Sequence, residues 1–436
     1  MAVESEHTTP VDHLGGGSAD GVPRSATAQW VRVGLVGFVV ALFWSPVVDR
    51  LVTDWGSRVL GINDYPLHLE LAQVFSISPY VNNSPHFLFH LVTAAWSVVL
   101  PDTTAAVVTI VVFIWATFLA VVVLMSQRDV RGETLGVAVS TGLAVWYFLA
   151  ETPALFALWS GAVPPTSPIY TLHWWGNPTW LAAFPFVVIT IPLVERALTE
   201  PQRGRWSRWE LALAAVTMVG AVAKPALAIP LVVGMPLYVF VVRRLPVARA
   251  WRLLAATTVP AAVVVAWQTW FLSTSSASRF GTGVRLQFIV DAPFGWSNVG
   301  LVWALPLLVP LTAMVIAGRD YWREPVVQLV LTLLAVAVPI MLFVTEQGSR
   351  TSDGNLAVPT QACVALWVLV SVRVAAQHIA RSWRAGGPAA LGPAEWIGLV
   401  VALSFSAGGV LAYLHALGAV DVPVDWVLAI SGGSAS

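Results

Sequence analysis

Of the 436 residues, 57% are hydrophobic and only 11% are charged, whereas soluble domains carry roughly 25% charged residues. So few charges cannot cover the surface of a soluble protein of this length. The 23 basic and 23 acidic residues cancel, and the basic ones are scattered, which excludes a nucleic-acid-binding surface. A lone cysteine, Cys363, excludes an intramolecular disulfide framework.

The chain starts with a polar segment, residues 1–28, that lacks the basic start of a signal peptide and is interpreted as a disordered cytoplasmic tail. Beyond it, the apolar residues fall into blocks long enough to cross a ~30 Å hydrocarbon core as helices. The predicted fold is therefore an all-α polytopic integral membrane protein. About eleven spans are expected, at 30–48, 104–126, 134–150, 177–196, 209–223, 226–243, 253–272, 298–317, 325–344, 358–380 and 395–417.

The apolar stretch 85–100 is not counted as a span. Counting it would place the arginine-bearing connections alternately on both sides, against the positive-inside rule. With 85–100 in the membrane interface, the N-terminus is cytoplasmic and the C-terminus is outside. The outer face of a bacterial cytoplasmic membrane then receives the long loop 49–103 and three shorter ones, 151–176, 273–297 and 345–357. Because long loops are usually functional, the site is expected outside.

The first outer loop contains Asp64, directly ahead of Tyr65 and Pro66. Proline is favoured in the first turn of a helix, and the apolar residues that follow have helical spacing. This predicts a helix over 66–77 that lies flat on the bilayer and carries His68. Asp64 is either a helix cap or a functional carboxylate.

A second interfacial helix is predicted over 85–100, again with a proline near its start. His86 and His90 are four residues apart, a spacing that would place two metal ligands on one helical face. The glutamate of an HExxH pattern is missing, so hydrogen bonding at the interface or to a substrate is favoured over metal binding.

Aromatic residues mark the outer start of the span at 177–196, where His173, Trp174 and Trp175 are followed by Asn177. Tryptophans collect at membrane interfaces as anchors. Paired tryptophans beside a histidine and an asparagine also form the apolar surface with polar edges that a sugar ring requires. Both interpretations stay open.

Two cationic positions are candidates for binding phosphate. Lys224, the only lysine, lies between two apolar blocks and is either a snorkelling anchor or a phosphate ligand. Arg350 follows Glu346 in the outer loop that leads through Asn355 into the next span. Its guanidinium group suits phosphate or carboxylate, and a structural ion pair with Glu346 is the alternative.

Together these features resemble the GT-C superfamily of polytopic glycosyltransferases. The resemblance rests on Asn63-Asp64 after the first span and on the two juxtamembrane helices at 66–77 and 85–100, the second with the sequence Pro-His-Phe-Leu-Phe-His. It assigns residues 29–200 to a GT-C-like core module and 201–436 to further C-terminal transmembrane helices. The motifs at 174–179, 224–225 and 346–355 resemble those of bacterial multi-span proteins without an assigned activity.

The resemblance implies transfer of a sugar from a polyprenyl-phosphate donor, within the membrane lipid, to an acceptor on the outer face. It implies Asp64 as catalytic base with inversion at the anomeric carbon, and Lys224 with Arg350 on the donor phosphate. Sugar and acceptor contacts are expected from His68, His86, His90, His173, Trp174, Trp175, Asn177, Glu346 and Asn355.

Two departures from the superfamily refine these expectations. Asp64 is followed by Tyr65 rather than by a second acidic residue, so no divalent metal and no other cofactor is expected. Without a soluble outer domain, the acceptor is expected to be small, lipid-borne or held by the loops. The alternative function is a transporter or flippase of a lipid-linked saccharide, which would have ionisable residues near the bilayer midplane.

Overall fold

The computed structural model describes residues 26–53, 65–75, 85–126, 178–199, 206–274, 284–286, 296–346 and 358–403. These residues are almost entirely helical, as predicted. The exception is an antiparallel pair of three-residue strands, β1 (Val284–Leu286) and β2 (Val344–Glu346), in which Arg285 lies opposite Thr345. The pair joins the predicted outer loop 273–297 to the boundary between the predicted span 325–344 and the outer loop 345–357.

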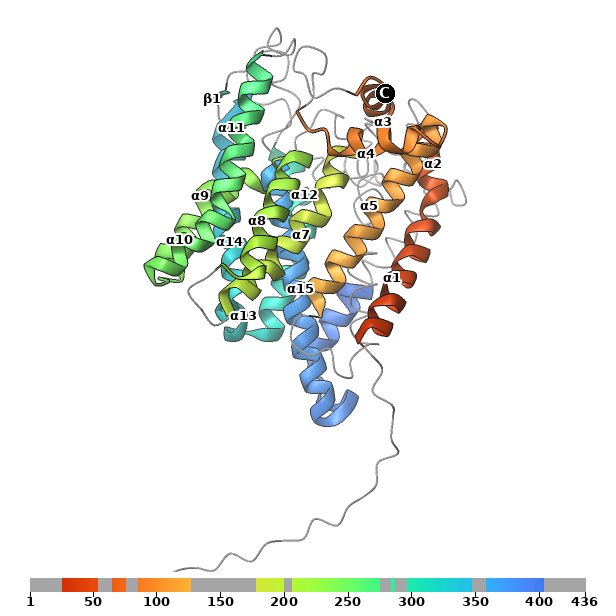
Figure 1. The fold of residues 1–436 in the computed structure, drawn as a ribbon. Coiled ribbons are helices and arrows are strands. Elements are labelled where there is room, and N and C mark those ends of the chain that lie inside the picture. The colour runs from red at the N-terminus through yellow and green to blue at the C-terminus, as the bar shows by residue number, and fades with distance from the viewer. Residues whose placement is uncertain are drawn as a thin grey trace, which may run out of the picture.

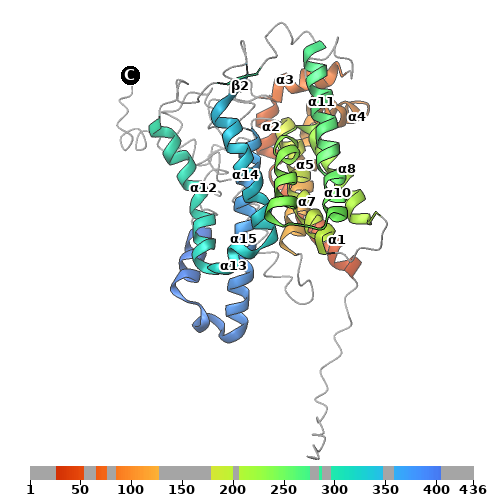
Figure 2. The same ribbon diagram turned by 90° about the vertical axis from the view of Figure 1, so that its left-hand side faces the viewer.

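The helices are coloured in chain order in Figures 1 and 2. They are α1 (Ala26–Phe43), α2 (Ser45–Thr53), α3 (Tyr65–Gln73), α4 (Leu88–Ser97), α5 (Asp102–Met125), α7 (Pro178–Thr199), α8 (Arg208–Ala223), α9 (Ala228–Pro236), the π-helix η2 (Leu237–Val242), α10 (Val247–Ala256), α11 (Thr258–Thr274), α12 (Trp296–Ala317), α13 (Arg319–Arg323), α14 (Pro325–Phe343), α15 (Val358–Gly386), the 3₁₀-helix η7 (Gly387–Ala390) and a helix over Pro393–Leu403.

Five helices among the described residues are long and apolar enough to cross a membrane. They cover Asp102–Met125, Pro178–Thr199, Val247–Thr274, Pro325–Phe343 and Val358–Ala390. Shorter apolar helices occupy most of the other predicted spans, and 134–150 lies outside the described residues. The protein is thus a helical membrane-type bundle, while the predicted number of eleven spans is not confirmed.

Helix α7 lies at the centre of this bundle. It packs against α5 and α8 along its length and also touches α4, α14 and α15. A helix that is apolar all round is suited to such a buried position. The outer helix α1 approaches α5 closely at Gly37, where an added Cβ would lie 2.4 Å from the ring of Phe118. Trp115 fixes the same contact by donating from Nε1 to the Gly34 carbonyl over 2.9 Å.

The two ends of the bundle carry different elements. Helices α2, α3 and α4 gather at one end, whereas α10 and α13 lie at the other (Figure 1). Helix α13 contains Arg319 and Arg323, and α10 contains Arg249 and Arg252. The short basic connections and the first loop's helices are therefore at opposite ends, although which end faces the cytoplasm stays a prediction.

The two predicted juxtamembrane helices are present with shifted boundaries. Helix α3 has Pro66 as its second residue, as predicted, and ends at Gln73. Helix α4 begins at Leu88, so the prediction that it starts near Pro85 was wrong. Its ten residues extend about 15 Å, half of a ~30 Å hydrocarbon core.

A buried ion pair connects α7 to α15. Arg373 donates from Nη1 and Nη2 to the two carboxylate oxygens of Glu195 over 2.8 and 3.0 Å. The two side chains are only 2% and 6% exposed. This two-bond geometry satisfies both charged groups within the bundle.

Candidate functional site

Lys224 lies at the end of helix α8, whose start and end are both encoded locally. At the start, Ser207 and Glu210 form a capping box, with backbone-to-side-chain distances of 3.2 and 2.8 Å. At the end, Lys224 is extended because Pro225 follows it, and its N–H bonds to the Gly220 carbonyl over 3.0 Å. Its side chain is buried, and the helix C-terminus favours its positive charge.

Two histidines from different helices form a contact in this region. His68 on α3 and His90 on α4 approach to 2.7 Å between Nδ1 and Nε2, and their rings stack at 5.0 Å between centroids. His90 is completely buried and His68 nearly so. Sequence spacing had paired His90 with His86 on one helical face, which the structure contradicts because His86 lies ahead of the helix.

Burial keeps both imidazoles neutral. It lowers the pKa of His90 from 6.5 to about 4. The pKa of His68 also lies well below its usual value, first because of burial and then because a positive charge on its ring would be repelled by a protonated His90, by Lys224 and by a protonated His86. Lys224 and the three histidines are therefore electrostatic neighbours, and they form what we call the Lys–His cluster.

Gln268 on α11 links this cluster to α8. Its Nε2 donates to the Ala221 carbonyl over 2.9 Å and lies 3.3 Å from His86 Nδ1. The side chain is 4% exposed. Sequence reasoning missed Gln268, although an amide within the apolar block 253–272 was a usable signal, since polar groups inside membrane segments are costly and often functional.

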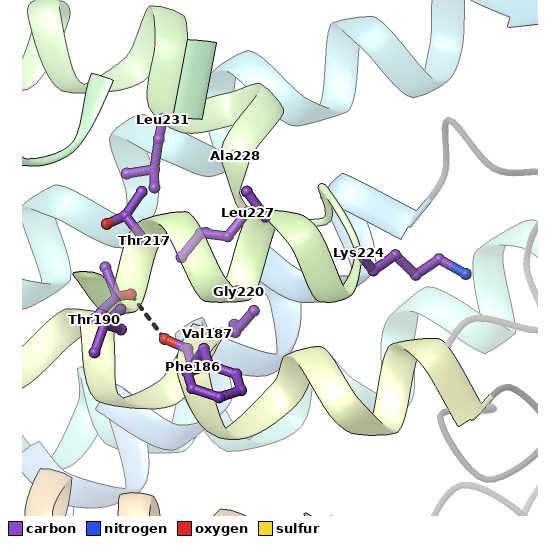
Figure 3. A pocket seen from close by; sticks show the side chains of 11 residues that line it. Phe186, Val187, Thr190, Thr217, Gly220, Lys224, Leu227, Ala228 and Leu231 are labelled. Carbon is purple, nitrogen blue, oxygen red and sulfur yellow. Dashed lines mark hydrogen bonds between the residues drawn. The ribbon is translucent and has the colours of Figure 1, made fainter. Parts of the chain in front are cut away.

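A small pocket adjoins Lys224 between α7, α8 and α9. Its walls are mainly apolar, with Phe186, Val187 and Leu231 among them, and its cavity volume is about 10 Å³. Such a cavity has room for one water molecule and not for a lipid chain. Figure 3 shows the Lys224 side chain extending away from these apolar residues, so its ammonium group is directed elsewhere.

The structure brings together His68, His86, His90 and Lys224, four of the predicted site residues. Glu346 is the last residue of β2, where its backbone pairs with Val284. The other predicted site residues lie outside the described residues: Asp64, His173, Trp174, Trp175, Asn177, Arg350 and Asn355. Within the described ranges, no group of three or more His, Cys, Asp or Glu side chains is arranged to hold a metal ion.

What the arrangement can do chemically is bind an anion. It combines a buried ammonium group with imidazole N–H donors, and it lies at the end of a bundle that contains membrane-type helices. No protein-family model, curated protein or solved structure matches the chain. The class supported by the fold is therefore a helical membrane protein, and its activity has to be argued from the cluster.

Proposed function

We propose that the protein is a membrane glycosyltransferase that moves a sugar from a polyprenyl-phosphate donor to an acceptor on the non-cytoplasmic face. The observation that carries this proposal is the burial of Lys224, the only lysine, beside three histidines at the bundle end that holds α3 and α4. A compact ammonium group is a point charge suited to phosphate. A phosphate attached to a membrane lipid would be presented at such a helix end.

The remaining roles follow from the chemistry of the transfer. Asp64, which directly precedes α3 in the sequence, is the proposed base that takes the proton of the acceptor hydroxyl. Direct displacement of the phosphate then inverts the anomeric carbon, and no metal ion is invoked. Arg350 is a proposed second phosphate ligand, while Trp174 and Trp175 are proposed to contact the sugar.

The decisive test compares wild-type protein and Asp64→Asn in lipid nanodiscs. Release of polyprenyl phosphate from a polyprenyl-phosphate hexose is followed in the presence of acceptor membranes. Loss of the base should lower turnover roughly 10²–10⁴-fold while donor binding stays normal. If Asp64 only caps α3, asparagine is an equally good cap and the variant should retain full turnover.

Asp102→Asn serves as the matched control. Asp102 is the acidic residue in the first turn of α5, and its Oδ2 accepts a hydrogen bond from Gln73 of α3 over 2.9 Å. Removing this nearby carboxylate should leave turnover unchanged. Equal losses in both variants would indicate general damage to the α3 region rather than loss of a base.

A transporter or flippase of a lipid-linked saccharide is the second candidate. It is favoured by one observation, the ion pair of Glu195 with Arg373 inside two candidate membrane-spanning helices. A transporter would move a fluorescent polyprenyl-phosphate sugar across proteoliposome membranes without releasing polyprenyl phosphate. A glycosyltransferase would release it without translocation.

A further inference from the structure

Gln268 has an unsatisfied polar atom beside His86 of the Lys–His cluster. Its Oε1 is buried and has no hydrogen-bond partner among the described residues. An unsatisfied buried acceptor is destabilising, and such a group in a native protein requires an explanation.

The hydrogen bonds around Gln268 fix the orientation of its amide. A carbonyl oxygen can only accept, so the group that contacts the Ala221 carbonyl at 2.9 Å must be the NH₂. The same nitrogen lies 3.3 Å from His86 Nδ1, which must then be the acceptor of the second N–H. Exchanging the two amide atoms would place Oε1 against the Ala221 carbonyl and lose that bond.

Two consequences follow for the cluster. A neutral His86 whose Nδ1 accepts must carry its proton on Nε2, so His86 presents a donor. Gln268 Oε1 presents an acceptor in the same neighbourhood. Beside Lys224, which supplies a positive charge, the cluster thus offers donors for a phosphate together with one acceptor that a fully ionised phosphate cannot satisfy.

We propose that Gln268 is a substrate-recognition residue whose Oε1 accepts a hydrogen bond from the sugar hydroxyl next to the phosphate bound by Lys224. This inference rests on the proposed function and narrows its substrate to a sugar with a free hydroxyl at C2. His86, which is half-buried and precedes α4, is the histidine of the cluster that contacts this amide, at 3.3 Å between its Nδ1 and Gln268 Nε2.

The competing explanation is a structural water. One ordered water could satisfy Oε1 without any substrate. The two explanations differ in what they predict for ligands, because a water is indifferent to the sugar while a recognition residue discriminates between a hydroxyl and a hydrogen.

The test uses four synthetic lipids and the full-length protein in nanodiscs. They are hexadecyl phosphate, its glucosyl and mannosyl phosphodiesters, and the 2-deoxy phosphodiester that both sugars share. Wild-type protein should bind at least one of the two hydroxylated sugars roughly 5- to 150-fold more tightly than the 2-deoxy lipid. Equal affinity for all three sugar lipids overturns the proposal and favours the water.

Two variants test whether Gln268 causes the preference for the C2 hydroxyl. Gln268→Met should abolish the preference for the C2 hydroxyl and keep the affinity for hexadecyl phosphate. Gln328→Met is the matched control, since this second glutamine uses both amide atoms, donating to the Trp322 carbonyl over 2.9 Å and accepting from Arg243 over 3.1 Å. It should leave the preference unchanged, and a loss of preference in Gln328→Met would also contradict the assignment.

The outcomes separate this inference from the proposed function. Failure of hexadecyl phosphate and all sugar lipids to bind would overturn both. Binding of hexadecyl phosphate that depends on Lys224, without discrimination at C2, would leave the phosphate site in place and remove Gln268 from recognition. Should Gln268→Met fail to fold, the ratio measured on wild-type protein alone decides the question.

Discussion

Breaking the ion pair between Glu195 and Arg373 should be among the most destabilising single changes in this protein. Arg373→Met removes the cation and leaves the Glu195 carboxylate, which is 6% exposed, without its positively charged partner. Removal of one partner of a buried pair costs about 3–5 kcal/mol, and the two bonds of 2.8 and 3.0 Å place this pair among the well-formed examples. Glu195→Leu should cost a similar amount, because it leaves the guanidinium group buried and unpaired.

The double variant Glu195→Leu with Arg373→Met should recover most of this loss. It replaces both charged groups by apolar ones of comparable size, a change that is often neutral for buried pairs. The coupling energy of the cycle should therefore be about 3 kcal/mol or more. Equilibrium unfolding in mixed detergent micelles, followed by the fluorescence of the 22 tryptophans, would measure all four proteins.

An exposed ion pair provides the control for this cycle. Asp320 and Arg323 on α13 are 4.0 Å apart, with side chains 60% and 77% exposed. Their cycle should give a coupling energy of only about 0–1 kcal/mol. Additive losses at Glu195 and Arg373, with no recovery in the double variant, would refute the argument that the two charges stabilise each other directly.

Three further changes test the cluster and the topology. Lys224→Ala should weaken binding of a polyprenyl-phosphate sugar by roughly 1.5–3 kcal/mol and Lys224→Arg by less, whereas unchanged affinity in the alanine variant would make Lys224 a snorkelling anchor. Because burial lowers the pKa of His90 from 6.5 to about 4, the unfolded state binds the proton more readily, and stability should fall by roughly 3 kcal/mol as pH drops through that interval. His90→Asn should reduce this loss of stability at acid pH. If the dependence of stability on pH is unchanged in the variant, the loss belongs to other titrating groups. With Cys363 removed, a single cysteine introduced at Ser276 should react with an impermeant thiol reagent on intact cells, and one introduced at Ser207 should react only after lysis. Labelling of position 207 on intact cells would invert the proposed orientation.

Local signals in the sequence were sufficient for much of the fold. Apolar blocks place the helices because a backbone inside lipid has to satisfy its own hydrogen bonds. Pro66 marks the first turn of α3, and Ser207 with Glu210 marks the start of α8. Each of these features depends on residues within a few positions of one another.

The contacts of the candidate site could not be predicted in the same way. His68 meets His90 across 22 positions, and Gln268 meets His86 across 182. Helical spacing paired His86 with His90 only on the assumption that α4 starts near Pro85, whereas it begins at Leu88 without a side-chain cap. Which residues of separate helices come together depends on packing, and a periodic pattern within one segment has no information about it.

The contrast between the Glu195–Arg373 ion pair and the Lys–His cluster supports a functional role for the cluster. Glu195 and Arg373 satisfy each other through two short bonds, so their geometry is complete without any ligand. In the Lys–His cluster and at Gln268 beside it, His90 Nδ1 and Gln268 Oε1 are buried and have no hydrogen-bond partner among the described residues. A group whose only task is to hold helices together gains nothing from leaving polar atoms unsatisfied, because each costs about 1–3 kcal/mol. A binding site does gain, because a ligand that supplies the missing hydrogen-bond partner is bound more tightly than one that cannot. The unsatisfied atoms destabilise the ligand-free protein, and they make the complex selective for such a ligand.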